Sequence, residues 1–460
     1  MSRLAATRRW LLLLPLFLIV IIFTASISQA NEPPPQPLFL SSTEAPLVPP
    51  APTDVRYRPV TINTAILGGS NGQPNLAASR LILNLFADVQ YTAVRDQTQH
   101  NLSGSFSWMG HLDGVPYSQV TLVLKDGVLV GIVASPEGIY EVRYYVGTTH
   151  LVYELDQAAF PDEHIEDGHD HEGDEVEGEE NGPAAATPFV PTDDGSIIDV
   201  MVFYTPNARD GAGGTAAIEN TIDMAIDWTN TSYQNSQVIQ RLNLVHKAEV
   251  TYSDSGSLST DLGRLRGTSD GYMDEIHALR NTYHADLVAL IVESPGCGIA
   301  YIMTNVSPAF ESSGFSVTMR SCAVGNYTFG HELGHNMSAR HDWIADPTNN
   351  SPFSYNHGHV APGNLWRTIM AYGSSCGNCP RLGYWSNPDV LYNGIPMGVP
   401  QGQSQAADNR LTLNTTALTV ANFRQSQPVI TPTPSATPTP TITPTPIQAE
   451  FFLPFIADEP

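Results

Sequence analysis

Residues 331–342, HELGHNMSARHD, contain three histidines and one glutamate within twelve residues. In a helix, residues four apart lie on the same face, so His331 and His335 can bind one metal ion together. Glu332 then lies beside that ion, where a base acting on a water molecule is needed. The alternative is a histidine-rich surface helix, but H-E-x-x-H followed by a third histidine six residues later rarely arises by chance. The segment therefore predicts a metal site with an adjacent base.

His341 tests whether this helix can continue. With a rise of 1.5 Å per residue, a continuous helix would place His341 about 15 Å along the axis from His331, too far to share an ion. The chain must therefore leave the helix soon after His335 and turn back. Glycine suits such a bend, but the sequence has Ser338 there. A non-glycine residue in a left-handed turn costs about 1–2 kcal/mol, which a folded domain can absorb, so we expect the turn to persist.

The elements before this motif alternate between strand and helix patterns. Residues 197–205, 241–252 and 285–293 have the apolar runs of buried strands. Residues 215–240 and 272–283 have helical spacing, with Ile218, Ile222, Ala225 and Ile226 on one face of the first helix. This alternation predicts a mixed α/β (α+β) domain in which helices cover a twisted, mostly parallel sheet.

The pattern H-E-x-x-H-x-x-G-x-x-H is the signature of the metzincin zinc peptidases. HELGHNMSARHD resembles the adamalysin, or reprolysin, branch, in which an Asp follows the third His, and the stretches GCGIAY, CAVGNYTFGHELGH and TIMAY are similar to secreted bacterial reprolysin-like peptidases. The resemblance covers about residues 197–424. It implies a metzincin-type catalytic domain with an active-site helix and one catalytic zinc ion. The zinc ligands would be His331, His335 and His341, and Glu332 would be catalytic.

The resemblance also implies a Met-turn beneath the zinc, for which Met370 in TIMAY is the match. In astacins and serralysins a tyrosine two residues later approaches the zinc, but this role is not typical of adamalysins. Tyr372 is therefore a candidate for stabilising an oxyanion, with core packing as the alternative. Ser338 departs from the family's glycine and leaves open a degenerate, inactive copy of the motif. Calcium sites are also left open by the sequence.

The parts of the motif predict a mechanism. Three neutral histidines leave zinc an open position for water. Glu332 would take a proton from that water, which then attacks a peptide carbonyl, and pass the proton to the leaving amine. The expected substrates are proteins or peptides.

The N-terminus has the features of a secretory signal peptide over residues 1–30. A basic segment precedes an apolar run at residues 10–23, and Ser28-Gln29-Ala30 offers small residues for cleavage. An uncleaved anchor is the alternative, although the run is short for a membrane span. After cleavage we expect no membrane span and a secreted, extracellular protein, with cell-envelope association left open.

Export implies an oxidising compartment in which the four cysteines can pair. Four cysteines permit three pairings, of which the simplest joins Cys297 to Cys322 and Cys376 to Cys379. The second pair has zinc-like C-x-x-C spacing, but no second such pair exists to complete a four-ligand site, so a small disulfide loop is the preferred interpretation.

Changes in composition divide the chain into segments. We expect a signal peptide (1–30), a Pro-rich linker (31–54), a β-rich domain (55–160), an acidic His-containing linker (161–195), the catalytic domain (196–427), a Thr/Pro-rich spacer (428–447) and a short tail (448–460). Asp126-Gly127 marks a hairpin in the β-rich domain. This domain looks like a propeptide that keeps the enzyme latent. It has no cysteine to block the zinc, so an acidic or histidine side chain would have to serve instead.

The formal net charge is −25, and much of it lies in the acidic linker. Nothing in the charge distribution indicates nucleic acid or an anionic membrane as a partner. We therefore expect a secreted zinc-dependent metalloendopeptidase, made as a latent zymogen and acting as a monomer. The alternative is a non-catalytic cell-surface binding or scaffold protein that retains the fold. Glu332 argues against it, because a purely structural zinc site has no use for a base.

Overall fold

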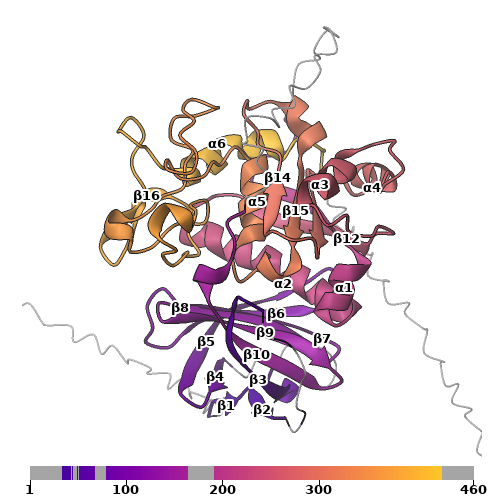
Figure 1. Cartoon of the computed structure of the whole chain (residues 1–460), viewed down its shortest axis with the longest axis vertical. Coiled ribbons are helices and arrows are strands. Elements are labelled where there is room, and N and C mark those ends of the chain that lie inside the picture. Colours follow the sequence, from indigo (N-terminus) through magenta and orange to yellow (C-terminus); the bar gives the residue numbers. More distant parts are fainter. Residues whose placement is uncertain are drawn as a thin grey trace, which may run out of the picture.

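The computed structural model describes residues 34–42, 44, 49, 51–67, 79–163 and 191–426. They form two lobes, an N-terminal lobe (34–163) and a C-terminal lobe (191–426), drawn one below the other in Figure 1. The fold mixes helices and sheets, in agreement with the predicted α/β class. The predicted signal peptide, most of the acidic linker, the Thr/Pro-rich spacer and the tail lie outside the described residues.

The N-terminal lobe is a ten-stranded sheet with the order β1-β4-β5-β6-β7-β8-β9-β10-β3-β2, antiparallel except for the pair β1 and β4. Asp126 and Gly127 both have positive φ, as a two-residue hairpin turn requires, so the predicted hairpin is confirmed. The strands are β1 (Gln36–Pro37), β2 (Phe39–Ser41), β3 (Asp54–Ile62), β4 (Arg80–Phe86), β5 (Val89–His100), β6 (Phe106–Leu112), β7 (Gln119–Lys125), β8 (Val128–Ser135), β9 (Gly138–Val146) and β10 (Thr149–Leu155), with 3-10 turns η1 (Thr64–Ile66) and η2 (Gln157–Ala159).

The middle of this sheet is buried on both faces. Successive side chains of a strand point to opposite faces. In β8, Leu129 and Val133 belong to the lobe's own apolar core, whereas Val130 and Ile132 belong to a core shared with the C-terminal lobe. The helix α2 (Thr215–Asn235) lies across this second face (Figure 1). The two lobes are therefore joined through an apolar contact.

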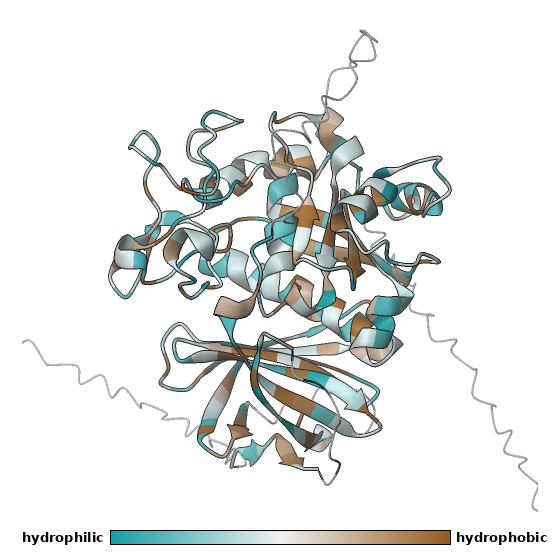
Figure 2. Cartoon of the chain, viewed as in Figure 1, coloured by the Kyte–Doolittle hydropathy of each residue, from teal (hydrophilic) through white to brown (hydrophobic). Residues whose placement is uncertain are grey.

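The C-terminal lobe contains a five-stranded sheet with the order β12-β11-β13-β15-β14. Every neighbouring pair is parallel except β14 with β15, which confirms the predicted mostly parallel sheet. The strands are β11 (Ile197–Tyr204), β12 (Arg241–Glu249), β13 (Leu287–Val292), β14 (Gly298–Ala300) and β15 (Phe315–Met319). All six residues of β13 are buried, which is typical of a central strand covered on both faces, and brown, hydrophobic residues mark this sheet in Figure 2.

Helices cover both faces of this sheet. Val202 of β11 lies in the core on the α2 side, and its neighbour Phe203 lies in the core formed with α3 and α4. The helices are α1 (Pro206–Ala212), α2, α3 (Leu258–Arg266), α4 (Glu275–Tyr283), α5 (Thr328–Asn336) and α6 (Asn409–Val420); 3-10 turns are η3 (Pro308–Ser313), η4 (Arg320–Cys322), η5 (Pro362–Asn364) and η6 (Ser374–Cys376), and a small hairpin joins β16 (Asn387–Tyr392) to β17 (Ile395–Met397). None of the helices within the described ranges combines the length and apolar character needed to span a membrane.

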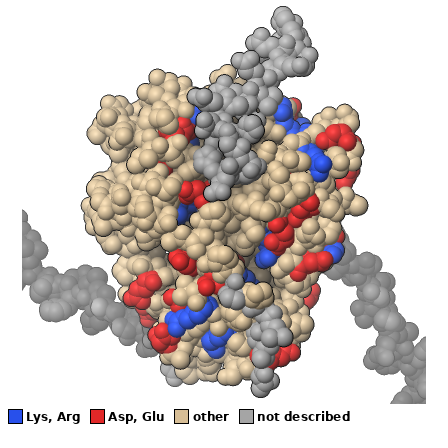
Figure 3. Space-filling view, viewed as in Figure 1, with Lys and Arg blue, Asp and Glu red and all other residues tan. Residues whose placement is uncertain are grey.

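Helix α2 has an apolar face and a polar stripe. The residues expected on its apolar face are buried: Ile218, Ile222, Ala225 and Ile226. The stripe consists of Asn220, Asp223 and Asp227, spaced three and four residues apart, and it faces the N-terminal lobe. Asn220 donates to the carbonyl of Val128 at 3.0 Å, and Ser105 donates to Asp223 at 2.6 Å. Elsewhere, on the face seen in Figure 3, basic and acidic side chains are scattered over both lobes.

Candidate metal site

The histidine site consists of His331, His335 and His341. His331 and His335 lie one turn apart on α5, and Nε2 of His341 is 3.1 Å from Nε2 of His331 and 3.0 Å from Nε2 of His335. All three side chains are buried. The structure therefore brings together the three histidines predicted from the sequence.

The outer nitrogens of two of these rings are fixed by carbonyl groups. Nδ1 of His331 lies 3.0 Å from the carbonyl oxygen of Ile369, and Nδ1 of His335 lies 2.8 Å from that of Ala339. A carbonyl oxygen can only accept, so each Nδ1 must carry the proton and each Nε2 must present a lone pair. Burial also lowers the pKa of His331 to about 4. Converging lone pairs on neutral rings are the donor set of a cation such as zinc, so these residues fit the metal.

The turn that returns His341 to the site lies directly after α5. The helix ends at Asn336, and Ser338 has φ of 72°, the left-handed conformation expected of this position. The amide of Ser338 donates to the carbonyl of His335 at 2.9 Å. Its buried hydroxyl donates to the carbonyl of Met303 at 2.8 Å, a bond that glycine would lack. The serine thus keeps the turn and adds an anchor to it.

Met370, the residue expected in the Met-turn, is fully buried. A Cβ added at Gly334 would lie 2.7 Å from the Trp385 ring and 3.2 Å from the sulfur of Met370. Gly334 is therefore required for close packing of α5 against these two side chains. The sequence analysis did not identify this role, although the glycine lies inside the histidine motif.

Glu332 is buried beside the histidine site, and burial raises the pKa of its carboxyl group well above the usual value. None of the described residues forms a hydrogen bond with its Oε1. A Cβ added at Gly298 of β14 would lie 2.4 Å from that oxygen, so the strand lies against the carboxylate. An unpartnered buried carboxylate oxygen next to three converging nitrogens suits a group that holds a water molecule.

Tyr372 packs on the histidine site, with its ring centroid 4.0 Å from that of His341. Its amide donates to Oδ2 of Asp342 at 3.0 Å. Oδ1 of Asp342 accepts from the amide of Ile344 at 3.0 Å. Asp342, which the sequence analysis treated only as a mark of the family branch, thus ties the chain after His341 to the chain after Met370.

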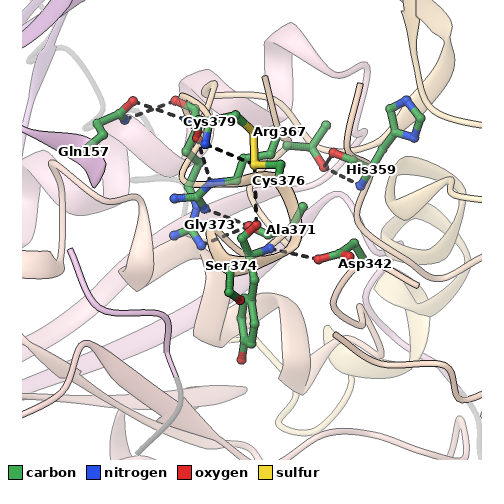
Figure 4. The surroundings of a disulfide bond; sticks show 12 residues. Gln157, Asp342, His359, Arg367, Ala371, Gly373, Ser374, Cys376 and Cys379 are labelled. Carbon is green, nitrogen blue, oxygen red and sulfur yellow. Dashed lines mark hydrogen bonds between the residues drawn. A yellow bond between two sulfur atoms is a disulfide. The ribbon is translucent and has the colours of Figure 1, made fainter. Parts of the chain in front are cut away.

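The structure contains two disulfides, Cys297–Cys322 and Cys376–Cys379, which agree with the expected pairing. Figure 4 shows the second, which closes a short loop next to Ala371 and Arg367. Its sulfurs are covalently joined, which supports the disulfide loop over half of a zinc site.

A second charged pocket adjoins the histidine site. This Arg381 pocket consists of Arg381, Asn326 and Thr328, and it encloses the carboxylate of Glu163 from the end of the N-terminal lobe. Nη1 and Nη2 of Arg381 donate to the two carboxylate oxygens, at 2.5 and 2.9 Å. Asn326 and Thr328 each donate to Oε1 at 3.3 Å. Although burial alone would raise it, the Arg381 guanidinium holds the pKa of Glu163 well below its usual range.

The residues next to Glu163 are also bound by the C-terminal lobe. Asp162 accepts hydrogen bonds from the amides of Gly373 and Ser374, at 2.8 and 3.3 Å. The side-chain amide of Gln157 exchanges two hydrogen bonds with the backbone of Arg381, at 3.1 and 3.2 Å. The acidic linker was expected to begin at residue 161, but its second and third residues, Asp162 and Glu163, dock on the C-terminal lobe. An acid-rich segment does not show which of its side chains binds another part of the protein. No pattern in the sequence therefore predicts this contact.

Comparison with known proteins agrees with this geometry. A family model described as "Metallo-peptidase family M12" matches residues 194–386, which include the whole histidine motif. Similar proteins carry the name peptidyl-Asp metalloendopeptidase, including the following three. The protein from Stenotrophomonas maltophilia is 37% identical over 314 residues, covering 67% of this chain and 71% of the relative. The protein from Xanthomonas campestris pv. campestris is 33% identical over 388 residues, covering 80% of this chain and 87% of the relative. The protein from Pseudomonas fragi is 36% identical over 197 residues, covering 43% of this chain and 99% of the relative.

Proposed function

Because the chain belongs to the M12 family of metallopeptidases and is a metalloendopeptidase, we propose that it is a secreted zinc enzyme made as a latent zymogen. Its substrates are proteins or peptides. From the name its relatives carry, we further propose that it cleaves next to aspartate. The single observation that supports a zinc enzyme best is the convergence of three buried imidazole nitrogens beside an unpartnered glutamate. The family favours this enzyme over the non-catalytic scaffold considered as the alternative.

In this proposal His331, His335 and His341 bind one zinc ion, which when bound polarises the substrate carbonyl and makes water more acidic. The carbonyls of Ile369 and Ala339 hold two of the rings in the ligating tautomer. We propose that Met370 is the Met-turn residue expected from the sequence, and its side chain is fully buried.

Glu332 is the proposed general base. Its unpartnered oxygen orients the attacking water and accepts a proton from it. The same carboxyl group then donates the proton to the amine of the departing peptide. Burial keeps bulk water from competing for this proton. For Tyr372 we propose that packing against His341 is the main role, which its ring contact supports, with stabilisation of an oxyanion as the second possibility.

We propose that the N-terminal lobe is a propeptide domain that follows a signal peptide and precedes an acidic linker. Strands β1 and β2 lie within the Pro-rich linker expected over residues 31–54, so part of that segment belongs to the lobe's sheet. Its docked end, Asp162 and Glu163, supports this role because it lies against residues next to the histidine site. Cleavage within residues 164–190 would then free a monomeric catalytic domain.

A casein-digestion assay on the processed protein tests this function. Digestion should stop when a zinc chelator is added and return when zinc is restored. Mass spectrometry of the fragments should place aspartate at the cut bonds. Digestion that continues unchanged in excess chelator would show that the enzyme does not depend on a metal ion.

A further inference from the structure

The Arg381 pocket holds its carboxylate with an arrangement that is specific for acids. A guanidinium that donates through both of its terminal nitrogens to the two oxygens of one carboxylate is a strong, geometrically selective contact. Two neutral donors, from Asn326 and Thr328, complete the enclosure. Arg381 and Glu163 are 2% and 5% exposed, so the pair is shielded from water.

Release of Glu163 would leave this pocket without its acid. Arg381 and Arg367 both donate to the carbonyl of Ala371, so two positive charges lie together under one stretch of backbone. A buried guanidinium that has lost its carboxylate is strongly unfavourable, and the pocket would favour any carboxylate of similar shape. Once the N-terminal lobe has left, the acid available at this place is a side chain of the bound substrate.

The Arg381 pocket lies close enough to Glu332, the proposed base, to bind a substrate side chain next to the cut bond. Thr328 and Glu332 are four residues apart on the same face of α5, about 6 Å along the helix axis. Gly298 contacts both: a Cβ added there would lie 2.4 Å from Oε1 of Glu332 and 2.6 Å from the Thr328 methyl group. One residue of an extended peptide spans about 3.3 Å. The acidic side chain that reaches the pocket would therefore belong to a residue next to the cut bond.

The end of the N-terminal lobe already occupies this place as a peptide segment. Phe160 is buried, the Asp162 carboxylate accepts from two backbone amides, and the Glu163 side chain fills the pocket. The loop closed by Cys376–Cys379 is followed closely by Arg381, and in Figure 4 the side chain of Gln157 points toward the backbone after this loop, where it bonds to Arg381.

We propose that Arg381 is the specificity-determining residue, which binds the acidic side chain of the substrate, and that Glu163 occupies its pocket in the precursor. This inference rests on the proposed peptidase function. It gives a physical cause for a preference for acidic side chains, aspartate included. The same contact would then serve recognition and occupation of the site before activation.

The test uses the full chain, allowed to process, and three peptides that differ at one residue, Asp, Asn or Ala, next to the cut bond. The parent enzyme should prefer the Asp peptide by about 100-fold or more in kcat/KM, because a site built for a polar group rejects analogues that lack it. Arg381→Gln should lose most of this preference, because its kcat/KM should fall much more on the Asp peptide than on the Asn and Ala peptides. Arg381→Lys should fall between them, since it keeps the charge and loses the paired donors.

Arg410→Gln is the matched control, because Arg410 also forms ion pairs in the C-terminal lobe, with Asp389 and Asp408. It should keep the preference of the parent. An equal loss on all three peptides in Arg381→Gln would mean that Arg381 is only structural and would overturn the inference. A parent enzyme that digests casein with zinc but does not distinguish the peptides would also overturn it, while leaving the proposed function intact. A parent that digests nothing would instead refute the proposed function.

A second measurement does not require an Arg381 variant to fold. A synthetic peptide of residues 158–165 should inhibit the processed parent enzyme at least about tenfold more strongly than the same peptide with Glu163→Gln. Only the native peptide has the negative charge that the guanidinium binds. A scrambled peptide of equal composition is the control. Equal inhibition by the native and the Gln peptides would show that the pocket does not select an acid.

Discussion

A buried glutamate, Glu332, lies beside the histidine site, and another, Glu163, occupies the Arg381 pocket. The two glutamates differ in the hydrogen-bond donors around them. Glu163 accepts from a guanidinium and two neutral groups, and the pKa of its carboxyl lies well below the usual range. Glu332 has no hydrogen bond to Oε1 from the described residues, and burial raises its pKa. Both are almost fully buried, so burial does not explain the difference. A carboxylate surrounded by donors is a fixed ligand, whereas one that lacks them remains free to exchange a proton.

The most direct way to break this comparison is Glu332→Gln. The amide keeps the shape but cannot accept the proton, so casein digestion should fall by about 10²–10⁴-fold. Zinc content, measured by elemental analysis, should stay at one ion per chain. A variant that digests casein at nearly the parent rate would show that Glu332 is not the base.

His341→Ala tests the other half of the histidine site. With two of three protein ligands left, zinc should bind far more weakly. The loss of affinity should exceed the roughly 10–100-fold that follows when a ligand loses its hydrogen-bond partner. Elemental analysis after dialysis should show little zinc, whereas His359→Ala, which changes a histidine outside the three-histidine group, should retain it. Full zinc content in His341→Ala would remove His341 from the ligand set.

Asp227 sharpens the comparison because it is a buried carboxylate whose surroundings are intermediate between those of Glu163 and those of Glu332. Burial raises its pKa to about 7; Ser107 donates to it and Lys247 lies near, both opposing the rise, while Asp223 adds to it. Its charged form is disfavoured when the lobes are docked, so docking should strengthen as pH falls from 8 to 6, by about 1 kcal/mol.

The change to make is Asp227→Asn in the precursor carrying Glu332→Gln, which cannot digest itself if Glu332 is the base. Thermal unfolding should then depend less on pH between 8 and 6 than in the same precursor with Asp227 intact. Asp210→Asn, at an exposed position, is the control. An unchanged pH dependence in Asp227→Asn would assign that dependence to another group.

The smallest expected effect concerns the turn at Ser338, which lies between His335 and His341. Ser338→Gly relieves a strain of about 1–2 kcal/mol, loses a hydrogen bond of about 1 kcal/mol and costs about 0.5–1 kcal/mol of chain entropy. The stability should therefore change by no more than about 1 kcal/mol. Ser338→Ala loses the bond and keeps the strain, so it should be less stable than Ser338→Gly by thermal unfolding with zinc bound. The reverse order would mean that the strain at this position is negligible.

The histidine site was readable from the sequence because its chemistry is local. Spacing of four residues and then six placed His331, His335 and His341, and the need for a bend located Ser338. Strands β11 and β13 were equally readable, since each is an almost continuous run of apolar, β-forming residues. Helix α6 was missed because threonines interrupt its apolar pattern, and α1 because it is only two turns long.

The Arg381 pocket could not be predicted from the sequence, because its residues are far apart along the chain. Arg381 and Glu163 are separated by 218 residues, and neither lies in a recognisable pattern. Glu163 was indistinguishable from the other acids of its run, and only the docking of one lobe on the other selects it. Long-range ion pairs of this kind are determined by tertiary packing, and a single sequence does not record them.

The polar stripe of α2 has a consequence for what happens when the lobes part. The C-terminal lobe would expose Asn220, Asp223 and Asp227, which water solvates readily. The N-terminal lobe would expose Val130 and Ile132 on a broad sheet face, which water solvates poorly. If this lobe is the propeptide proposed above, its release would therefore expose an apolar face that favours self-association. Loss of the released lobe would make activation irreversible.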